Sequence, residues 1–278
     1  MKIAVIGLGL IGGSLAKACK QNAGNVVLGY DISESVALKA KLVGAIDKVI
    51  TPADIGEADV VFVALYKAQT IEFVKANATK FKKGAIVMDC AGTKRGICEE
   101  LSAVASAHGF YFVGSHPMAG REQSGFEYSR DNLFDNASML LTPTAGTPIE
   151  VLAKIKAICK DIGFAEVVIT TPEHHDEVIA FTSQLAHVVS NAYVKSPTAK
   201  IQRGYSAGSY RDMTRVAYMN VPMWRELFFD NKDNLCNEID TLIKNLTELK
   251  GAIKAGDAKG LTKLLEEGVN AKKEADKI

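Results

Sequence analysis

The sequence predicts an α/β domain followed by an all-α domain. Residues 1–171 alternate short apolar, strand-like segments with helical patterns, which is the chain order of strands joined by crossover helices. From Pro172 to Ile278 no segment has a convincing strand pattern, and helical periodicity dominates. We therefore divide the 278 residues, a length that allows two domains, into a sheet domain (1–171) and a helical domain (172–278).

The first 31 residues predict a strand, a glycine turn, a helix, a second strand and an acid. The apolar segment ending at Ile6 is followed by Gly7, Gly9 and Gly12, which fill the pattern G-x-G-x-x-G. The first glycine permits the turn, the second lets the backbone approach a pyrophosphate, and the third lets the helix pack closely on the strand. The alternative is a glycine-rich turn that binds nothing. Because strand, helix, second strand and Asp31 all fall at the expected places, the stretch predicts a dinucleotide-binding Rossmann domain.

The same stretch predicts which dinucleotide is bound. The helix that begins at Leu10 and Ile11 offers unpaired backbone N–H groups to a pyrophosphate. Asp31 lies nineteen residues after Gly12, where its carboxylate can accept both ribose hydroxyls. That carboxylate would repel the 2′-phosphate of NADP, and no arginine is adjacent, so we expect NAD.

The rest of the sheet domain continues the alternation. The predicted helices cover residues 33–43, 68–81, 95–108 and 149–162, and the predicted strands 47–51, 59–65, 84–89, 110–114, 138–142 and 166–170. Two strands end in polar segments, at residues 89–94 and in a loop at 115–122. Ligands of open α/β sheets bind outside the carboxyl ends of strands, so both segments are candidate site segments.

The helical domain has apolar residues on more than one helix face. Helices are predicted from residue 171 to 192, then at 210–219, 223–231, 235–255 and from about 257, with a looser Gly/Ser stretch at 204–209. In the helix at 235–255 the apolar residues are Leu235, Ile239, Leu242, Ile243, Leu246 and Leu249. The faces either pack within the domain or against a second copy of the chain. We favour a homodimer.

Composition argues against several other classes of protein. The 33 basic and 32 acidic residues give a net charge of +1 without a basic cluster, so nucleic acid and membrane surfaces are not expected partners. The five cysteines are scattered and contain no C-x-x-C pair, which predicts reduced thiols in a cytoplasmic protein, without disulfides or zinc. No segment approaches the roughly 20 apolar residues that a membrane span requires.

Four segments together resemble the prephenate/arogenate dehydrogenase family of tyrosine biosynthesis. They are IGLGLIGGSLA, DCAGTKR, GSHPMAGRE and YRDMTRVAYMNVPMWREL, and the resemblance covers essentially the whole chain. It implies a Rossmann domain followed by a helical dimerisation domain, with the active site in the cleft between them. It also implies NAD-dependent oxidative decarboxylation of prephenate to 4-hydroxyphenylpyruvate.

The resemblance assigns a catalytic base and a substrate-binding cation. His116 matches the family's catalytic histidine, which hydrogen-bonds the C4 hydroxyl of the substrate; an ordinary pKa of about 6.5 suits a proton acceptor at neutral pH. Without the flanking residues, it would equally well be a loop histidine bonded to backbone. Arg215 matches the arginine that holds a substrate carboxylate through paired hydrogen bonds. Arg211, one turn earlier, is either a second cation or a surface ion-pair partner.

Further positions match residues that line the family's site, and each also has a plain structural explanation. The expected substrate contacts are Ser183, His187, Glu122 and Trp224, and the expected cofactor contacts after residue 89 are Thr93 and Lys94. His187 could equally be a core histidine, Glu122 a surface acid and Trp224 a core aromatic residue. The run His174-His175-Asp176 suggests a metal site at first sight. Adjacent side chains on a helix are expected to point apart, and hydride transfer needs no metal, so we expect none.

One position departs from the family's pattern. The segment after Asp89 usually carries a serine that orients the catalytic histidine, and alignment on Lys94 places Gly92 there. Either Thr93 supplies the hydroxyl, or backbone or water orients His116. Because the sequence ends at Ile278, we expect no regulatory or chorismate mutase domain, and any feedback inhibition by tyrosine would act at the active site.

Three alternatives remain at this stage. Arogenate, or both substrates, would be used by a sibling enzyme that differs only in accepting an amino group in place of the keto group. A β-hydroxyacid-type dehydrogenase would place a lysine on a helix of the second domain, where Lys195 is the candidate. A catalytically silent dinucleotide sensor is the third.

Overall fold

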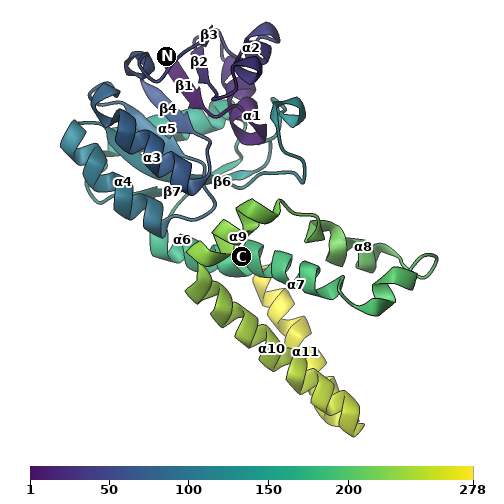
Figure 1. Ribbon diagram of the computed structural model, residues 1–278. Coiled ribbons are helices and arrows are strands. Elements are labelled where there is room, and N and C mark those ends of the chain that lie inside the picture. Colours follow the sequence, from purple (N-terminus) through teal and green to yellow (C-terminus); the bar gives the residue numbers. More distant parts are fainter. Residues whose placement is uncertain (278) are drawn as a thin grey trace.

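The computed structural model describes residues 1–277 and confirms the predicted fold class, a Rossmann-type sheet domain followed by helices (Figure 1). The sheet has eight strands in the order β3-β2-β1-β4-β5-β6-β7-β8, all parallel to their neighbours except β6 and β7. The strands are β1 (Lys2–Ile6), β2 (Val26–Tyr30), β3 (Lys48–Val49), β4 (Val60–Val63), β5 (Ile86–Asp89), β6 (Tyr111–Pro117), β7 (Ser138–Pro143) and β8 (Glu166–Ile169).

Helices cover both faces of the sheet and form two separate cores. They are α1 (Leu10–Lys20), α2 (Glu34–Leu42), α3 (Lys67–Asn77), α4 (Arg95–His108) and α5 (Ile149–Ile162). Helices α1, α2 and α5 pack on one face with Phe62 and Phe134 in the core, whereas α3 and α4 pack on the other with Val61 and Leu101. Strands β1 and β4 are apolar on both faces because both faces are covered.

Strand β6 is longer than the sequence predicts, and this changes the position of the candidate base. The strand was expected to end at residue 114, with His116 in the following loop. In the structure the antiparallel partner β7 extends the pairing, with His116 opposite Leu140 and Pro117 opposite Met139. His116 is therefore a strand residue, and the prediction that it lies in a loop is wrong.

The second half of the chain is helical, as predicted (Figure 1). A continuous helical segment begins with α6 (Pro172–Ile179), passes through a π-helical turn (Ala180–Leu185) and ends with α7 (Ala186–Tyr193). The Thr171 hydroxyl accepts a hydrogen bond from the His174 N–H and so caps α6. The remaining helices are α8 (Gly208–Thr214), α9 (Val221–Asp230), α10 (Lys232–Ala255) and α11 (Ala258–Ala275).

Two details of the helical half differ from the expectation or add to it. The single helix expected at 210–219 is instead α8 followed by a short 3₁₀ turn, Arg215–Ala217. Helices α10 and α11 pack against each other as an antiparallel pair that extends away from the sheet domain (Figure 1).

Ion pairs join α9 and α10 to the sheet domain. Lys67, at the start of α3, contacts Asp230 at 2.9 Å. The guanidinium of Arg95 contacts Asp233 at 2.6 Å and Asp176 at 3.3 Å. The carboxyl ends of β5 and β6 consequently face the helical half. Within the described residues 1–277, no helix is long and apolar enough to cross a membrane.

Candidate active site

The turn after β1 has the geometry that the glycine pattern predicts. Gly7 has a φ of +84°, and a Cβ on it would lie 2.6 Å from the Ala64 carbonyl oxygen. A Cβ on Gly12 would lie 1.8 Å from the carbonyl oxygen of Gly7. Gly9 is different, because its Cβ would have no atom within 4 Å. Two glycines are thus required by the turn itself, whereas the third borders open space of the kind a pyrophosphate would need.

The start of α1 and the end of β2 complete this part of the site. Gly9 is the N-cap of α1 and gives it no side-chain cap, so the first-turn N–H groups of Leu10 and Ile11 are left for a ligand. The carboxylate of Asp31 accepts hydrogen bonds from the N–H of Leu8 at 2.8 Å and of Ser33 at 2.9 Å. These bonds fix the carboxylate at the carboxyl end of β2, beside the glycine turn.

A buried lysine ties together the ends of β5 and β6. The ammonium of Lys94 forms an ion pair with Asp89 and donates to the carbonyl of Ser115 at 2.7 Å, and both side chains of the pair are essentially inaccessible to solvent. Asp89 also accepts from the N–H of Ser115 at 2.9 Å. Lys94, expected to contact the cofactor, is therefore placed inside the protein, where it fixes the backbone immediately before His116.

His116 contacts a second histidine that comes from the helical half. Its Nδ1 lies 3.0 Å from Nε2 of His175, and Nδ1 of His175 lies 2.8 Å from a carboxylate oxygen of Asp176. His175 and Asp176 are buried in the first turns of α6. The expectation that adjacent side chains of this helix point apart is wrong for this pair, because both side chains turn toward the ends of β5 and β6.

Burial sets the charge of these groups. Burial, with the neighbouring His175 and the positive charge of Lys94, holds the pKa of His116 well below its usual 6.5. Burial also lowers the pKa of His175. Burial would raise the pKa of Asp176, but hydrogen bonds from His175 and from the backbone N–H groups of Arg95 and Lys94 outweigh it and lower that pKa. Both imidazoles are thus neutral and Asp176 is ionised at neutral pH.

Neither partner that the sequence suggested for His116 is the one observed. The Thr93 hydroxyl is directed to Asp230, at 3.4 Å, rather than to His116. Gly92 faces α9, and a Cβ on it would lie 2.9 Å from a terminal methyl of Leu227. The side chain that contacts the His116 ring is instead the imidazole of His175.

A second group of predicted residues lies on α7, α9 and the turn after α8. The rings of His187 and Trp224 stack with centroids 3.7 Å apart. Nδ1 of His187 donates to the carbonyl of Ser183 at 2.9 Å, within the π-helical turn. Burial, opposed by that hydrogen bond and aided by Arg215, lowers the pKa of His187. The predicted set Ser183, His187 and Trp224 is therefore brought together.

Arg215 is exposed and meets an acid from the sheet domain. Its guanidinium donates to the carboxylate of Glu122 at 3.0 Å, and the two side chains are 68% and 39% exposed. Glu122 lies in the loop after β6, so this pair spans the two halves near the strand that carries His116. Arg211 is also exposed and lies on α8, one turn before Arg215.

The sequence did not indicate that His175 and Asp176 lie behind His116. A signal was present, because an adjacent histidine and aspartate occur early in a helix that begins with proline at the domain boundary. The expectation that adjacent side chains point apart applies to exposed helix faces. It does not hold here, because the first turn of this helix is buried against the sheet domain.

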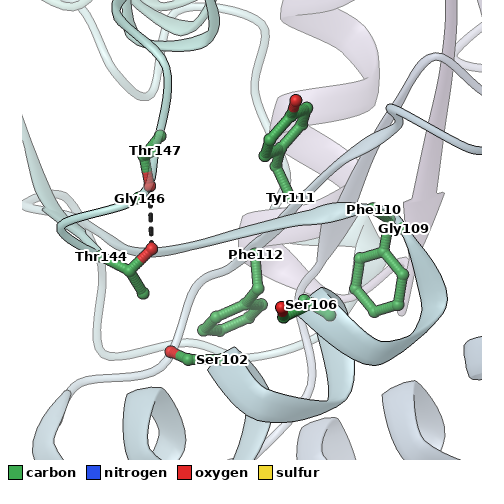
Figure 2. A pocket seen from close by; sticks show the side chains of 10 residues that line it. Ser102, Ser106, Gly109, Phe110, Tyr111, Phe112, Thr144, Gly146 and Thr147 are labelled. Carbon is green, nitrogen blue, oxygen red and sulfur yellow. Dashed lines mark hydrogen bonds between the residues drawn. The ribbon is translucent and has the colours of Figure 1, made fainter.

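A cavity elsewhere in the sheet domain is not part of this site. It has a volume of about 270 Å³ and lies between the end of α4, the start of β6 and the loop after β7 (Figure 2). Ser102, Phe112 and Thr147 are among its lining residues, and none of these lining residues is charged. His116 lies at the other end of β6, so the cavity is at the wrong edge of the sheet for the predicted ligands.

Comparison with known proteins agrees with this arrangement. The family described as "Prephenate dehydrogenase, nucleotide-binding domain" matches residues 15–175, and "Prephenate dehydrogenase, dimerization domain" matches residues 171–267. The chain belongs to the prephenate dehydrogenase family. This confirms the family predicted from the four sequence segments.

Individual members of the prephenate dehydrogenase family cover almost the whole chain. A cyclohexadienyl dehydrogenase from Zymomonas mobilis is 34% identical over 97% of this chain and 94% of its own length. A. aeolicus prephenate dehydrogenase, solved with hydroxyphenyl propionate and NAD⁺, has a TM-score of 0.88 at 30% identity, covering 99% of this chain and 98% of that one. Synechocystis arogenate dehydrogenase has a TM-score of 0.85 at 27% identity, covering 99% and 100%.

Proposed function

We propose that this chain is an NAD-dependent prephenate dehydrogenase, which converts prephenate to 4-hydroxyphenylpyruvate in tyrosine biosynthesis. The observation that carries the proposal is His116, a neutral imidazole held at the carboxyl end of β6 and facing the helical half. A proton acceptor at the same edge of the sheet as a dinucleotide turn is what the oxidation of a ring alcohol requires.

The residues of the glycine turn fit NAD. The open space beside Gly9, the free N–H groups at the start of α1 and the carboxylate of Asp31 match a pyrophosphate and a ribose in turn. Asp31 would have to exchange its bonds to Leu8 and Ser33 in part for ribose hydroxyls. When bound, the oxidised nicotinamide would supply the hydride acceptor.

His116 receives the proton of the substrate's C4 hydroxyl. Its lowered pKa keeps the imidazole ready to accept a proton across the neutral range. Loss of the ring carboxylate as CO₂ leaves an aromatic ring, so the overall reaction is strongly favourable. The protein then has to align the ring and hold the proton.

We assign the binding of the substrate's carboxylate to Arg215. Its charge helps to lower the pKa of His187, which stacks on Trp224, and its guanidinium is exposed enough to exchange Glu122 for a ligand. Lys195, the candidate acid of a β-hydroxyacid dehydrogenase, is exposed beyond the end of α7, which supports that alternative poorly.

Arogenate is the second candidate substrate, and the protonation of His187 favours it. Since the Ser183 carbonyl accepts the Nδ1 hydrogen, neutral His187 has its lone pair at Nε2. A lone pair there would accept a hydrogen bond from the ammonium of arogenate but none from the keto oxygen of prephenate.

The test is NADH formation with prephenate and arogenate in parallel. His116→Ala should lower kcat about 10²–10⁴-fold, the usual effect of removing a positioned base. The wild-type rate should fall only at pH values well below 6.5, because protonation of His116 is disfavoured. Arg215→Ala, the contrasting variant, should raise KM with less effect on kcat. NADH formation with neither substrate, or a rate unchanged in His116→Ala, would refute the proposal.

We also propose that the chain divides near Thr171 and works as a homodimer in the cytoplasm. Strand β8 ends at Ile169 and α6 begins at Pro172, which supports the boundary. The family description of residues 171–267 and the exposed apolar residues of α10 support the dimer. Five thiols without disulfide partners support a reducing compartment. Feedback inhibition by tyrosine stays a prediction.

A further inference from the structure

We propose that His175 and Asp176 are positioning residues that fix which nitrogen of His116 carries the proton, so that Nε2 is the proton acceptor. This inference rests on the proposed function for its catalytic meaning. The structural part of it, the protonated nitrogen of His116, can be measured without any turnover.

The first step is the charge of Asp176. Its carboxylate accepts from the N–H of Lys94 at 2.7 Å and of Arg95 at 3.0 Å, at the N-terminus of α4. A carboxylate that accepts several N–H bonds at a helix N-terminus is held ionised. An ionised carboxylate only accepts hydrogen bonds, so Nδ1 of His175, 2.8 Å away, must carry a hydrogen.

The second step passes this constraint to His116. His175 is buried and neutral, and a neutral imidazole with its hydrogen on Nδ1 has a lone pair on Nε2. That Nε2 lies 3.0 Å from Nδ1 of His116, which must then be the donor. The hydrogen of neutral His116 is thereby placed on Nδ1, and its Nε2 keeps the lone pair.

The arrangement matters because histidine by itself prefers the other form. In water, neutral imidazole side chains carry the hydrogen mainly on Nε2, which would leave His116 with its lone pair on Nδ1, facing His175. Within residues 1–277, no side chain other than His175 forms a hydrogen bond with the His116 ring. Gly92 lies against Leu227 and Thr93 is directed to Asp230, so among the described side chains the His175–Asp176 pair is the one placed to set the form of the base.

The same pair accommodates the charge that forms during the reaction. The O–H bond of the substrate hydroxyl breaks and a new N–H bond forms at Nε2 of His116, which becomes an imidazolium. Its Nδ1 hydrogen then donates to His175 more strongly, and the negative charge of Asp176 lies behind His175. The positive charge of Lys94 is already neutralised by Asp89 and therefore opposes this step less than a free ammonium would.

The direct test is nitrogen NMR of the ligand-free protein labelled in its histidine side chains. At neutral pH we expect the His116 signals, assigned by their loss in His116→Ala, to show a protonated Nδ1 and an unprotonated Nε2. His175 should show the same pattern. If wild-type His116 carries its hydrogen on Nε2, the proposal is overturned, whatever the activity of the enzyme.

Two variants of His175 connect the position of the His116 hydrogen to catalysis. His175→Leu removes the acceptor and should return the His116 hydrogen to Nε2 and lower kcat, by at most about the 10⁴-fold seen when the tautomer-setting residue of a catalytic triad is replaced. KM and NAD affinity should change little. His175→Gln offers an amide oxygen to Nδ1 of His116 and should restore the NMR pattern and most of kcat.

His174→Leu is the matched control, because His174 is the exposed neighbour that contacts only Glu177 and its own turn. It should leave both the His116 signals and kcat unchanged. A His175→Leu protein with the wild-type His116 pattern, or with the wild-type kcat, would contradict the proposal. Failure of the proposed function would look different, since the NMR pattern would stand while neither substrate is oxidised.

Discussion

The two halves of the molecule differ in how completely they bury their apolar residues. The sheet half has two cores, one on each face of the sheet, around the central strands β1, β4 and β5, whose residues are almost all buried. Among the described residues after Pro172, the buried hydrophobic residues are Ile179, Ala180, Leu185 and Leu235. Three of these four precede α8, and α11 contributes none. Only the sheet half therefore has hydrophobic cores of its own that are fully buried.

Helix α10 shows the difference in one element. Leu235, Ile239, Leu242 and Leu249 lie on the face that is buried or partly buried. Ile243, Leu246 and Ile253 continue the same apolar stripe farther along the helix, and each is at least 55% exposed. Apolar residues that stay exposed along the stripe of a helix indicate an interface. The exposed part of this half is therefore where we expect the second subunit of the proposed homodimer to pack.

The largest effect on assembly is expected from a charge among the exposed apolar residues of α10. Leu246→Asp would place a carboxylate in the proposed interface, and a two-fold dimer contains it twice. At about 2 kcal/mol or more for each copy, the dimer should weaken by roughly 1000-fold, measured by sedimentation or light scattering on dilution.

Leu42→Asp is the matched control for that variant. Leu42 is 86% exposed at the end of α2 in the sheet half, and the variant should keep the wild-type mass and melting temperature. If Leu42→Asp disrupts assembly and Leu246→Asp does not, the comparison between the halves is reversed.

An intermediate effect is expected within the sheet half, at two glycines three residues apart. Gly12→Ala would place a Cβ against the Gly7 carbonyl and should lower the free energy of unfolding by about 1–3 kcal/mol. Gly9→Ala has room for its Cβ, so stability should stay within about 0.5 kcal/mol of wild type. NAD affinity should nevertheless fall in Gly9→Ala, which calorimetric titration would detect. Equal melting temperatures for the two variants would contradict the conclusion that Gly12, unlike Gly9, has no room for a Cβ.

The smallest effect is expected where the halves meet. The Arg95 guanidinium holds the pKa of Asp233 well below its usual value, but Asp233 is 57% exposed, so Asp233→Asn should cost at most about 1 kcal/mol. Because the folded-state pKa is depressed, the contribution is complete above the unfolded pKa of about 3.9 and is lost as pH falls below it. Urea unfolding at neutral and acidic pH would show the two proteins converging at low pH. If the difference in unfolding free energy between wild type and Asp233→Asn stays constant with pH, it does not arise from the ion pair with Arg95.

Much of the fold was predictable, because strands and helices of the sheet half are marked by continuous apolar runs, glycine turns and helical periodicity. Helices at 95–108 and 149–162 were predicted with the bounds of α4 and α5. The extension of β6 was not predictable, because an antiparallel partner distant in sequence supplies the hydrogen bonds that keep residues 115–117 in the strand.

The candidate site was predicted as a set of residues but not as a set of contacts. His116, His187, Trp224 and Arg215 follow from motifs, yet no motif shows that His116 meets His175. That contact depends on how the first turn of α6 packs under the ends of β5 and β6. Lys94 was likewise expected to contact the cofactor. Its burial beside Asp89 could not be predicted, because burial of a charged side chain depends on tertiary structure.

Asp176 belongs at once to the joint between the halves and to the chain of groups behind His116. Its carboxylate caps α4 through Lys94 and Arg95 and also holds His175. Separation of the halves at this point would withdraw the carboxylate from α4 and the imidazole from His116 in one movement. If His175 sets the protonated nitrogen of His116 as proposed, a rearrangement at this joint would also remove the contact that prepares His116 to accept a proton.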